Sequence, residues 1–207
     1  MDLSVLYARG QVDSPLRIRL VRDDMLYIMR HGKTEWNELR KLQGQTDIPL
    51  NEDGCLMAQA ARDKYINVHF DLCFSSPLKR AAQTAEILLN GRDVPIITDG
   101  RLKEMSFGEY EGTVNYAEDP DCEINVLFKD PEAYKEADKG AETLAELFER
   151  VDSFLSQKVL SDVSKGKDIL IVGHKVLNSA IICRINKLPL SEFWNNDTQQ
   201  CKLLRLI

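Results

Sequence analysis

Along most of the chain, short uninterrupted apolar runs alternate with segments in which apolar residues recur at helical spacing. The uninterrupted runs predict buried strands at 26–29, 72–74, 95–98, 168–172 and about 202–206. The helical spacing predicts helices at about 51–66, 78–89, 142–160 and 176–186. Because the two kinds of segment alternate, the sequence predicts an α/β fold. We expect a three-layer α/β/α sandwich with a mostly parallel central sheet.

Two of the predicted helices begin with recognisable local signals. Asn51 stands directly before the first helix and belongs to the residue types that cap helix N-termini. Pro77 precedes the second helix, and we expect it in the first turn, where its missing N–H costs no hydrogen bond.

Two segments lie outside this alternation. Residues 1–24 contain four arginines and show no clear period, and Met25 follows them immediately before the first strand. Two interpretations stay open: a genuine N-terminal extension, or an upstream start with Met25 as the physiological first residue. Residues 113–140 are polar and contain Pro120 and Pro131, which predicts a helical or irregular insertion. We expect residues 25–207 to form one domain.

Composition narrows the class of protein. A chain of 207 residues that is 43% apolar and 29% charged is typical of one globular domain. A net charge of −6 argues against nucleic-acid binding, which needs clustered Lys and Arg. It leaves open a small phosphorylated ligand, which experiences only the local field of its pocket.

The cysteines and the apolar runs bear on location. Five cysteines are dispersed without a CxxC pair, which predicts reduced thiols in a cytoplasmic protein. The longest apolar runs have the length of a strand, too short to span a bilayer, and no secretory signal is evident. We therefore expect no membrane association.

Polar groups follow three of the predicted strands. They are Arg30-His31-Gly32, Ser75-Ser76-Pro77 and Gly173-His174. Ligands of open α/β sheets bind outside the carboxyl ends of the strands. We therefore expect these three groups to meet around one site.

His31 is the candidate nucleophile. A single histidine at a strand end is by itself equally well a structural group. The neighbouring Arg30, however, would lower the imidazole pKa and keep the ring neutral near pH 7. The carbonyl of Gly32 could hold the ring in one tautomer. Together with Arg80, at the start of the helix that follows Ser76-Pro77, Arg30 would form a two-pronged clamp for phosphate oxygens.

Three further residues are candidates for the same site. Asn37 could donate to a phosphoryl oxygen, and His174 could hold the equatorial oxygens. Glu104, in a glycine-punctuated loop, could protonate a leaving alkoxide and then accept a proton from water. Glu109 and Glu111 lie nearby and compete with it for that role.

The motifs that carry these residues resemble those of the histidine phosphatase superfamily, the phosphoglycerate mutase-like proteins. Residues 30–37 (Arg-His-Gly-Lys-Thr-Glu-Trp-Asn) resemble its signature. Residues 75–87 and 102–112 resemble its second and third motifs, and residues 50–59 and 139–143 its helix starts. The resemblance covers about residues 25–207 and implies the phosphoglycerate mutase-like form of the α/β/α sandwich.

The resemblance also implies roles for individual residues. His31 would become a phosphohistidine intermediate with Glu104 as the proton donor. Arg30, Asn37, Arg80 and His174 would bind the phosphoryl group. No metal and no cofactor is implied, because arginines and histidines supply the positive charge.

One segment departs from the family pattern. Where the family usually has Val-Ser-His-Gly-Gly, this chain has Val172-Gly-His-Lys-Val, so Lys175 replaces a glycine beside the pocket. This cation could add affinity for phosphate or carboxylate, or could narrow the site. Gln43, Gly44 and Lys175 are candidate substrate contacts, and specificity is expected to come from their loops and from residues 113–140.

The expected function is hydrolysis of a small phosphorylated metabolite. Mutases of the family usually carry a longer insertion and a C-terminal tail, and here the insertion is short and the chain stops after the last strand. A phosphoglycerate-type mutase and a catalytically silent binder of phosphorylated ligands remain alternatives. Candidate substrates include sugar phosphates, phosphoglycerates, phosphoserine, nucleotides and α-ribazole phosphate. A homodimer through an edge strand is also open.

Overall fold

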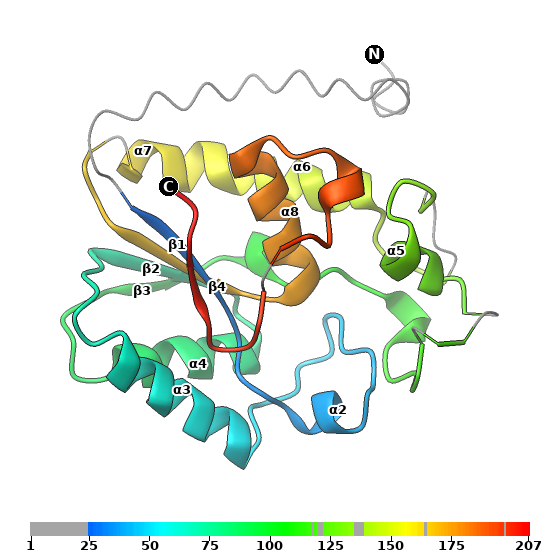
Figure 1. Cartoon of the computed structure of the whole chain (residues 1–207), viewed down its shortest axis with the longest axis horizontal. Coiled ribbons are helices and arrows are strands. Elements are labelled where there is room, and N and C mark those ends of the chain that lie inside the picture. The colour runs from blue at the N-terminus through cyan, green and yellow to red at the C-terminus, as the bar shows by residue number, and fades with distance from the viewer. Residues whose placement is uncertain (1–24, 117, 120–121, 135–138, 164, 197) are drawn as a thin grey trace.

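A computed structural model describes residues 25–116, 118–119, 122–134, 139–163, 165–196 and 198–207 (Figure 1). Its centre is a five-stranded sheet in the order β3-β2-β4-β1-β5. The strands are β1 (Leu26–Arg30), β2 (Leu72–Ser75), β3 (Ile96–Thr98), β4 (Ile169–Gly173) and β5 (Leu203–Arg205). All neighbouring pairs are parallel except β1 and β5, which are antiparallel. The mostly parallel sheet predicted from the sequence is confirmed.

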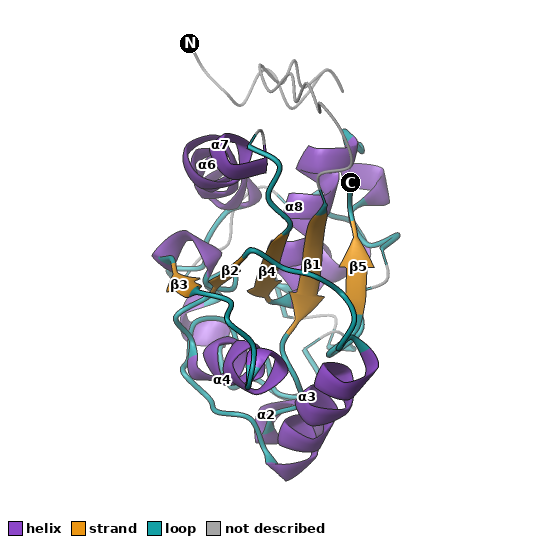
Figure 2. Cartoon of the chain, turned by 90° about the vertical axis from the view of Figure 1, so that its left-hand side faces the viewer, coloured by secondary structure: helices purple, strands orange, loops and turns teal. Residues whose placement is uncertain are grey.

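Helices cover both faces of the sheet, which confirms the three-layer arrangement (Figure 2). One layer contains α3 (Glu52–Lys64) and α4 (Lys79–Leu89), and the other contains α6 (Leu144–Phe154) and α8 (Lys175–Asn186). The described part of the chain also contains three shorter α-helices, α2 (Glu35–Glu38), α5 (Asn125–Lys129) and α7 (Leu160–Val163).

The central strand β4 explains why its sequence is continuously apolar. Ile169, Leu170, Ile171 and Val172 are all fully buried, because helices cover both of its faces. Side chains of alternate residues enter opposite cores, so Ile169 and Ile171 join one apolar cluster and Leu170 and Val172 the other.

The helix starts agree with the sequence in part. Asn51 caps α3, accepting a hydrogen bond from the Gly54 N–H at 2.9 Å. Pro77, expected in the first turn of α4, lies before it, because Leu78 is still extended and the helix begins at Lys79. The predicted helix at 142–160 begins at Leu144 after a Thr143 capping box, and a π-helical segment at Leu155–Val159 separates it from α7.

Two segments, residues 113–140 and residues 1–24, lie outside the predicted alternation of strands and helices. Residues 113–140 contain α5 within otherwise irregular chain, as the proline content predicted, in the parts that the structure describes. Residues 1–24, for which two interpretations were open, lie outside the described residues. No helix in the described ranges combines the length and apolar character that crossing a bilayer requires.

Candidate active site

The register of the sheet brings the predicted polar groups to one edge. Arg30 at the end of β1 is paired with Gly173 of β4, and Ser75 at the end of β2 is paired with Val172. A cavity opens at this edge. It is lined by eight of the residues predicted from the sequence, Arg30, His31, Asn37, Gln43, Gly44, Arg80, Glu104 and Lys175.

His31 is held as a neutral imidazole with a fixed tautomer. Its side chain is buried, and Nδ1 lies 2.6 Å from the carbonyl oxygen of Gly32. A carbonyl only accepts hydrogen bonds, so Nδ1 carries the proton and Nε2 keeps its lone pair. Burial lowers the His31 pKa well below 6.5, and Arg80 and then Arg30 lower it further. The sequence indicated only the smaller of these two arginine effects and not burial itself.

His174 lies beside His31 but does not line the cavity. It is fully buried, and the two ring centroids are 5.1 Å apart. Neither ring nitrogen of His174 has a hydrogen-bond partner within the described part of the chain. Its pKa is also lowered well below 6.5, first by burial and then by Arg80 and His31. Such a buried and unsatisfied ring is available to a ligand oxygen that reaches it.

Arg80 is the most buried charged side chain of the site. It is 0% exposed, and its guanidinium donates to the carbonyls of Gly44 at 2.6 Å and Thr46 at 2.9 Å. Burial lowers its pKa to about 10, which leaves it charged at neutral pH. The two carbonyl contacts engage one N–H of each terminal nitrogen, Nη1 and Nη2, and Nε has no partner among the described residues.

Arg30 faces the same cavity and is held more loosely. Its Nη1 lies 3.5 Å from the Thr198 carbonyl, and its Nε has no partner in the described ranges. Burial lowers its pKa, while the charge of Glu104 acts in the opposite direction. The two arginines therefore place uncommitted donors at one cavity, which is the requirement for a phosphate clamp.

Glu104 comes from the loop after a short 3₁₀ turn at Gly100–Leu102. Its carboxylate accepts hydrogen bonds from the N–H groups of Met105 at 3.0 Å, Leu177 at 3.0 Å and Val176 at 3.2 Å. The last two belong to the first turn of α8, whose free N–H groups attract a carboxylate. Glu104 is therefore fixed against α8 while it lines the cavity.

Asn37 and Gln43 are tied to each other through Thr34. The side-chain oxygen of Asn37, Oδ1, accepts hydrogen bonds from the Thr34 N–H at 3.1 Å and from Gln200 Nε2 at 2.8 Å. Gln43 Oε1 accepts from the Thr34 hydroxyl at 3.0 Å. Because these side-chain oxygens already accept hydrogen bonds, Asn37 and Gln43 can offer a ligand their side-chain amide N–H groups.

Lys175 stands at the mouth of the cavity against an aromatic wall. Its ammonium lies 5.2 Å from the ring centroid of Trp194 and 6.0 Å from that of Phe128, and these two rings stack on each other. Desolvation and the charge of Arg30 lower its pKa. Lys41 lines the cavity too, so Lys175 adds to a surplus of positive charge there.

Glu111 has a structural task that the sequence did not indicate. Its Oε1 accepts from the N–H groups of Gln45 at 2.8 Å and Phe107 at 3.2 Å, and its Oε2 accepts from the N–H and hydroxyl of Thr46. Glu111 thereby holds the 44–46 loop whose carbonyls hold Arg80. Its distance in sequence from that loop left no signal for this role.

Two further residues have supporting roles that were not predicted from the sequence. Thr84 accepts from the Gly32 N–H at 3.0 Å, and Gln200 donates to Asn37 Oδ1. Thr84 lies in the recognised second motif, but nothing in the sequence linked it to Gly32. The position of Gln200 follows from the sheet, because Gln200 forms a bridge with Arg30.

A cluster of side chains that could hold a metal ion lies away from this cavity. His69, Asp71 and Asp168 come together just before the starts of β2 and β4, at the opposite edge of the sheet. Both aspartates already accept backbone N–H groups, Asp71 from Asp168 at 2.8 Å and Asp168 from Met25 at 3.1 Å. These contacts join strand starts, which is a structural role.

Comparison with known proteins shows which family and which fold this chain resembles. The profile of the histidine phosphatase superfamily (branch 1) matches residues 26–207. A 2,3-bisphosphoglycerate-dependent phosphoglycerate mutase of Cytophaga hutchinsonii is 31% identical, over 79% of this chain and 78% of its own. An adenosylcobalamin/α-ribazole phosphatase of Salmonella typhimurium is also 31% identical, over 84% and 86%. A phosphoserine phosphatase of Entamoeba histolytica, crystallised with phosphoserine, superposes with a TM-score of 0.72 at 25% identity, over 87% and 89%.

Proposed function

This chain belongs to the histidine phosphatase superfamily, and from that premise we propose that it hydrolyses a small phosphorylated metabolite through a phosphohistidine on His31. One observation carries the proposal. A neutral His31 with its tautomer fixed by Gly32 lines the same cavity as two arginines and the carboxyl group of Glu104. Together they supply the nucleophile, the phosphate clamp and the proton carrier of a two-step transfer.

In the first step, Nε2 of His31 attacks the phosphorus atom and the bond to the leaving oxygen breaks. Arg30, Arg80, Asn37 and His174 bind the three phosphoryl oxygens and stabilise the charge that spreads over them. Glu104 acts as the general acid and gives a proton to the leaving alkoxide. The products are an alcohol and phosphohistidine.

In the second step, water takes the place of the alcohol. The Glu104 carboxylate accepts a proton from that water. At the same time the water oxygen attacks phosphorus and the P–N bond breaks. His31 is regenerated with its lone pair on Nε2, and inorganic phosphate leaves. The arginines provide the positive charge that a metal ion supplies in kinases, so we propose that neither metal nor cofactor takes part.

Trapping the intermediate tests this proposal directly. The protein is mixed with a ³²P-labelled phosphate monoester, quenched in alkali, and compared with His31→Ala. A P–N bond survives alkali and is lost in acid, so the label is expected on wild type only and only until acidification. Label that survives acid, or that remains on His31→Ala, would contradict the assignment of His31.

A phosphoglycerate-type mutase is the second candidate, because one of the relatives described above is such an enzyme. A mutase returns the phosphoryl group from His31 to a second hydroxyl instead of to water. The two are separated by incubating the protein with 3-phosphoglycerate and a bisphosphorylated primer. Formation of the 2-isomer faster than release of phosphate would favour the mutase.

Residues around the mouth of the cavity are proposed to select the substrate. Gln43, Gly44 and Lys175 line the cavity, and Lys41 adds a further positive charge. Arg30 and Arg80 already match the phosphoryl group, so Lys41 and Lys175 are free to attract a negative group elsewhere on the metabolite.

We also propose that the protein is cytoplasmic. The five cysteines are free thiols in the structure, which supports this location.

A further inference from the structure

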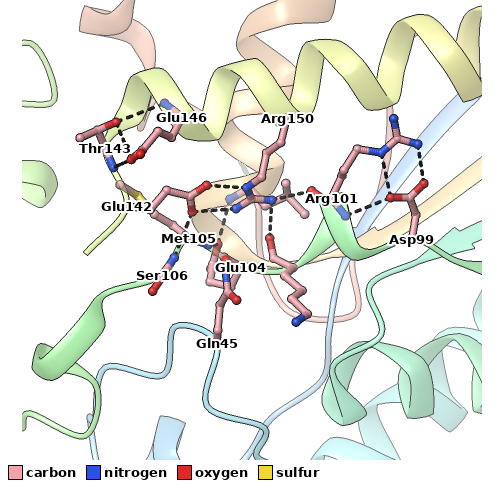
Figure 3. Close-up of polar contacts among 12 residues, drawn as sticks. Gln45, Asp99, Arg101, Glu104, Met105, Ser106, Glu142, Thr143, Glu146 and Arg150 are labelled. Carbon is pink, nitrogen blue, oxygen red and sulfur yellow. Dashed lines mark hydrogen bonds and ion pairs between the residues drawn. The ribbon is translucent and has the colours of Figure 1, made fainter. Parts of the chain in front are cut away.

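We propose that Arg150 and Glu142 are positioning residues that hold Glu104 in place for proton transfer. The inference rests on the proposed function, because it assigns these two residues to the step in which Glu104 acts as a general acid. Neither residue lines the cavity. Both act on the backbone of the 101–106 loop, which carries Glu104 (Figure 3).

Arg150 of α6 grips the loop on the N-terminal side of Glu104. Its Nη1 donates to the carbonyl of Lys103 at 2.8 Å and also to the carbonyl of Arg101. One guanidinium nitrogen thus satisfies the carbonyl just before Glu104 and the carbonyl two residues earlier. As Figure 3 shows, the side chain descends from the helix onto the loop.

Glu142 grips the same loop on the C-terminal side of Glu104. Its Oε2 accepts from the Ser106 N–H at 3.1 Å, and its own N–H donates to the Ser106 carbonyl at 2.8 Å. The carbonyl of Glu104 itself accepts from Gln45 Nε2 at 3.2 Å. The backbone is therefore held one residue before, at and two residues after the residue that must deliver the proton.

The two grips are joined into one unit. Arg150 binds Glu142 with two parallel contacts, Nε to Oε1 and Nη2 to Oε2, the latter at 3.0 Å. The side chains are 18% and 12% exposed, so solvent screens the pair only weakly. A bidentate pair has a defined geometry as well as energy, which suits it to fixing the distance between α6 and the loop.

Such an arrangement has a consequence for catalysis. The Glu104 carboxylate reaches both the first turn of α8 and the cavity only when the loop is correctly positioned relative to α8. A displacement of about 1 Å can cost about 100-fold in rate, because proton transfer needs hydrogen-bond distance. The ion pair on α6 therefore supports the acid without touching substrate.

The test uses two phosphate esters that differ in how much they need an acid. Phenoxide is a poor leaving group and needs the proton from Glu104, whereas 2,4-dinitrophenolate departs without one. The readout is kcat/KM, which reports the transfer to His31. Arg150→Met is expected to lower kcat/KM for phenyl phosphate about 10-fold to 100-fold and to change that for 2,4-dinitrophenyl phosphate less than about threefold.

Non-additivity supplies the second readout. Glu104→Gln is expected to show the same dependence on the leaving group, and Arg150→Met added to it is expected to cost less than about twofold more. Arg150→Lys keeps the positive charge but loses the fork, and should resemble Arg150→Met. If Arg150→Met does not fold, Arg150→Lys and Glu142→Gln carry the same test.

Asp152→Asn is the matched control. Asp152 lies two residues further along α6 and forms an ion pair with Arg184 of α8 at 2.8 Å. Its loss is expected to leave the ratio of the two kcat/KM values unchanged. Equal losses with both esters in the Arg150 and Glu142 variants, or full additivity with Glu104→Gln, would overturn the inference. Wild type that releases no phosphate from 2,4-dinitrophenyl phosphate would instead overturn the proposed function.

Discussion

The imidazole rings of His31 and His174 lie with their centroids 5.1 Å apart in a fully buried pair. Burial and the charges of Arg80 and Arg30 lower the pKa of both rings well below 6.5. The same arginines that would clamp a phosphoryl group thus also keep the adjacent histidines neutral. One cluster of charges therefore prepares both the nucleophile and the binding site.

The lowered pKa of His31 predicts how activity depends on pH. Protonation removes the lone pair of Nε2, and it occurs only well below pH 6.5. We expect kcat/KM with 2,4-dinitrophenyl phosphate to stay level as the pH falls through 6.5 and to decline only at lower pH. A decline centred at 6.5, the ordinary histidine value, would contradict the burial argument.

The same two histidines should make folding stability depend on pH. In the unfolded chain both titrate near 6.5, whereas in the folded state they stay neutral. The unfolded state therefore binds more protons below pH 6.5, and the free energy of unfolding falls as the pH decreases. The expected slope is up to about 1.4 kcal/mol per pH unit for each ring. Urea titrations at pH 7.5 and 5.5 measure it, and His174→Asn should reduce the difference.

Arg80 should govern affinity for the phosphoryl group itself. Arg80→Lys keeps a cation but loses the planar fork that binds Gly44 and Thr46. We expect kcat to fall about 100-fold to 1,000-fold and competitive inhibition by inorganic phosphate to weaken. Arg62→Lys, a change in an arginine of α3 paired with Asp63, is the control and should leave both unchanged.

Substitutions of Glu111 and of Glu109 should have different effects on stability and activity, although the two residues lie in the same turn. Glu111 serves four donors of the chain, so Glu111→Gln is expected to cost about 1–3 kcal/mol and several degrees of Tm. Its activity should fall as well, because the loop that holds Arg80 loosens. Glu109→Gln should behave like wild type in thermal melts and in phosphate release. Loss of activity in Glu109→Gln would revive it as the proton donor.

Lys175 should distinguish substrates by the charge on their organic part. Lys175→Gly is expected to raise KM about 10-fold for phosphate monoesters that carry a second anionic group. KM for uncharged alkyl phosphates should hardly change. Lys175→Met is the companion variant, because it keeps the packing against Trp194 and Phe128 but removes the charge. Equal effects on both kinds of substrate would assign Lys175 a packing role only.

Much of this protein could be predicted from the sequence, because local patterns carried the information. The apolar run of Ile169–Val172 marked the central strand, and Asn51 marked a helix start that the structure confirms. Strand ends pointed to His31 and His174, since carboxyl ends of parallel strands share one edge of a sheet. The motifs then identified the family, which the profile over residues 26–207 confirms.

Only the tertiary structure decided what holds these residues in place. Burial, which lowers the histidine pKa values, is a property of the whole packed core and not of any neighbour in sequence. Glu111 supports the loop around Arg80 from more than 60 residues away, and Arg150 reaches the loop of Glu104 from α6. Such contacts depend on which surfaces of folded elements meet. Periodicity and motifs determine the elements, whereas the distances between their side chains exist only after the layers have packed.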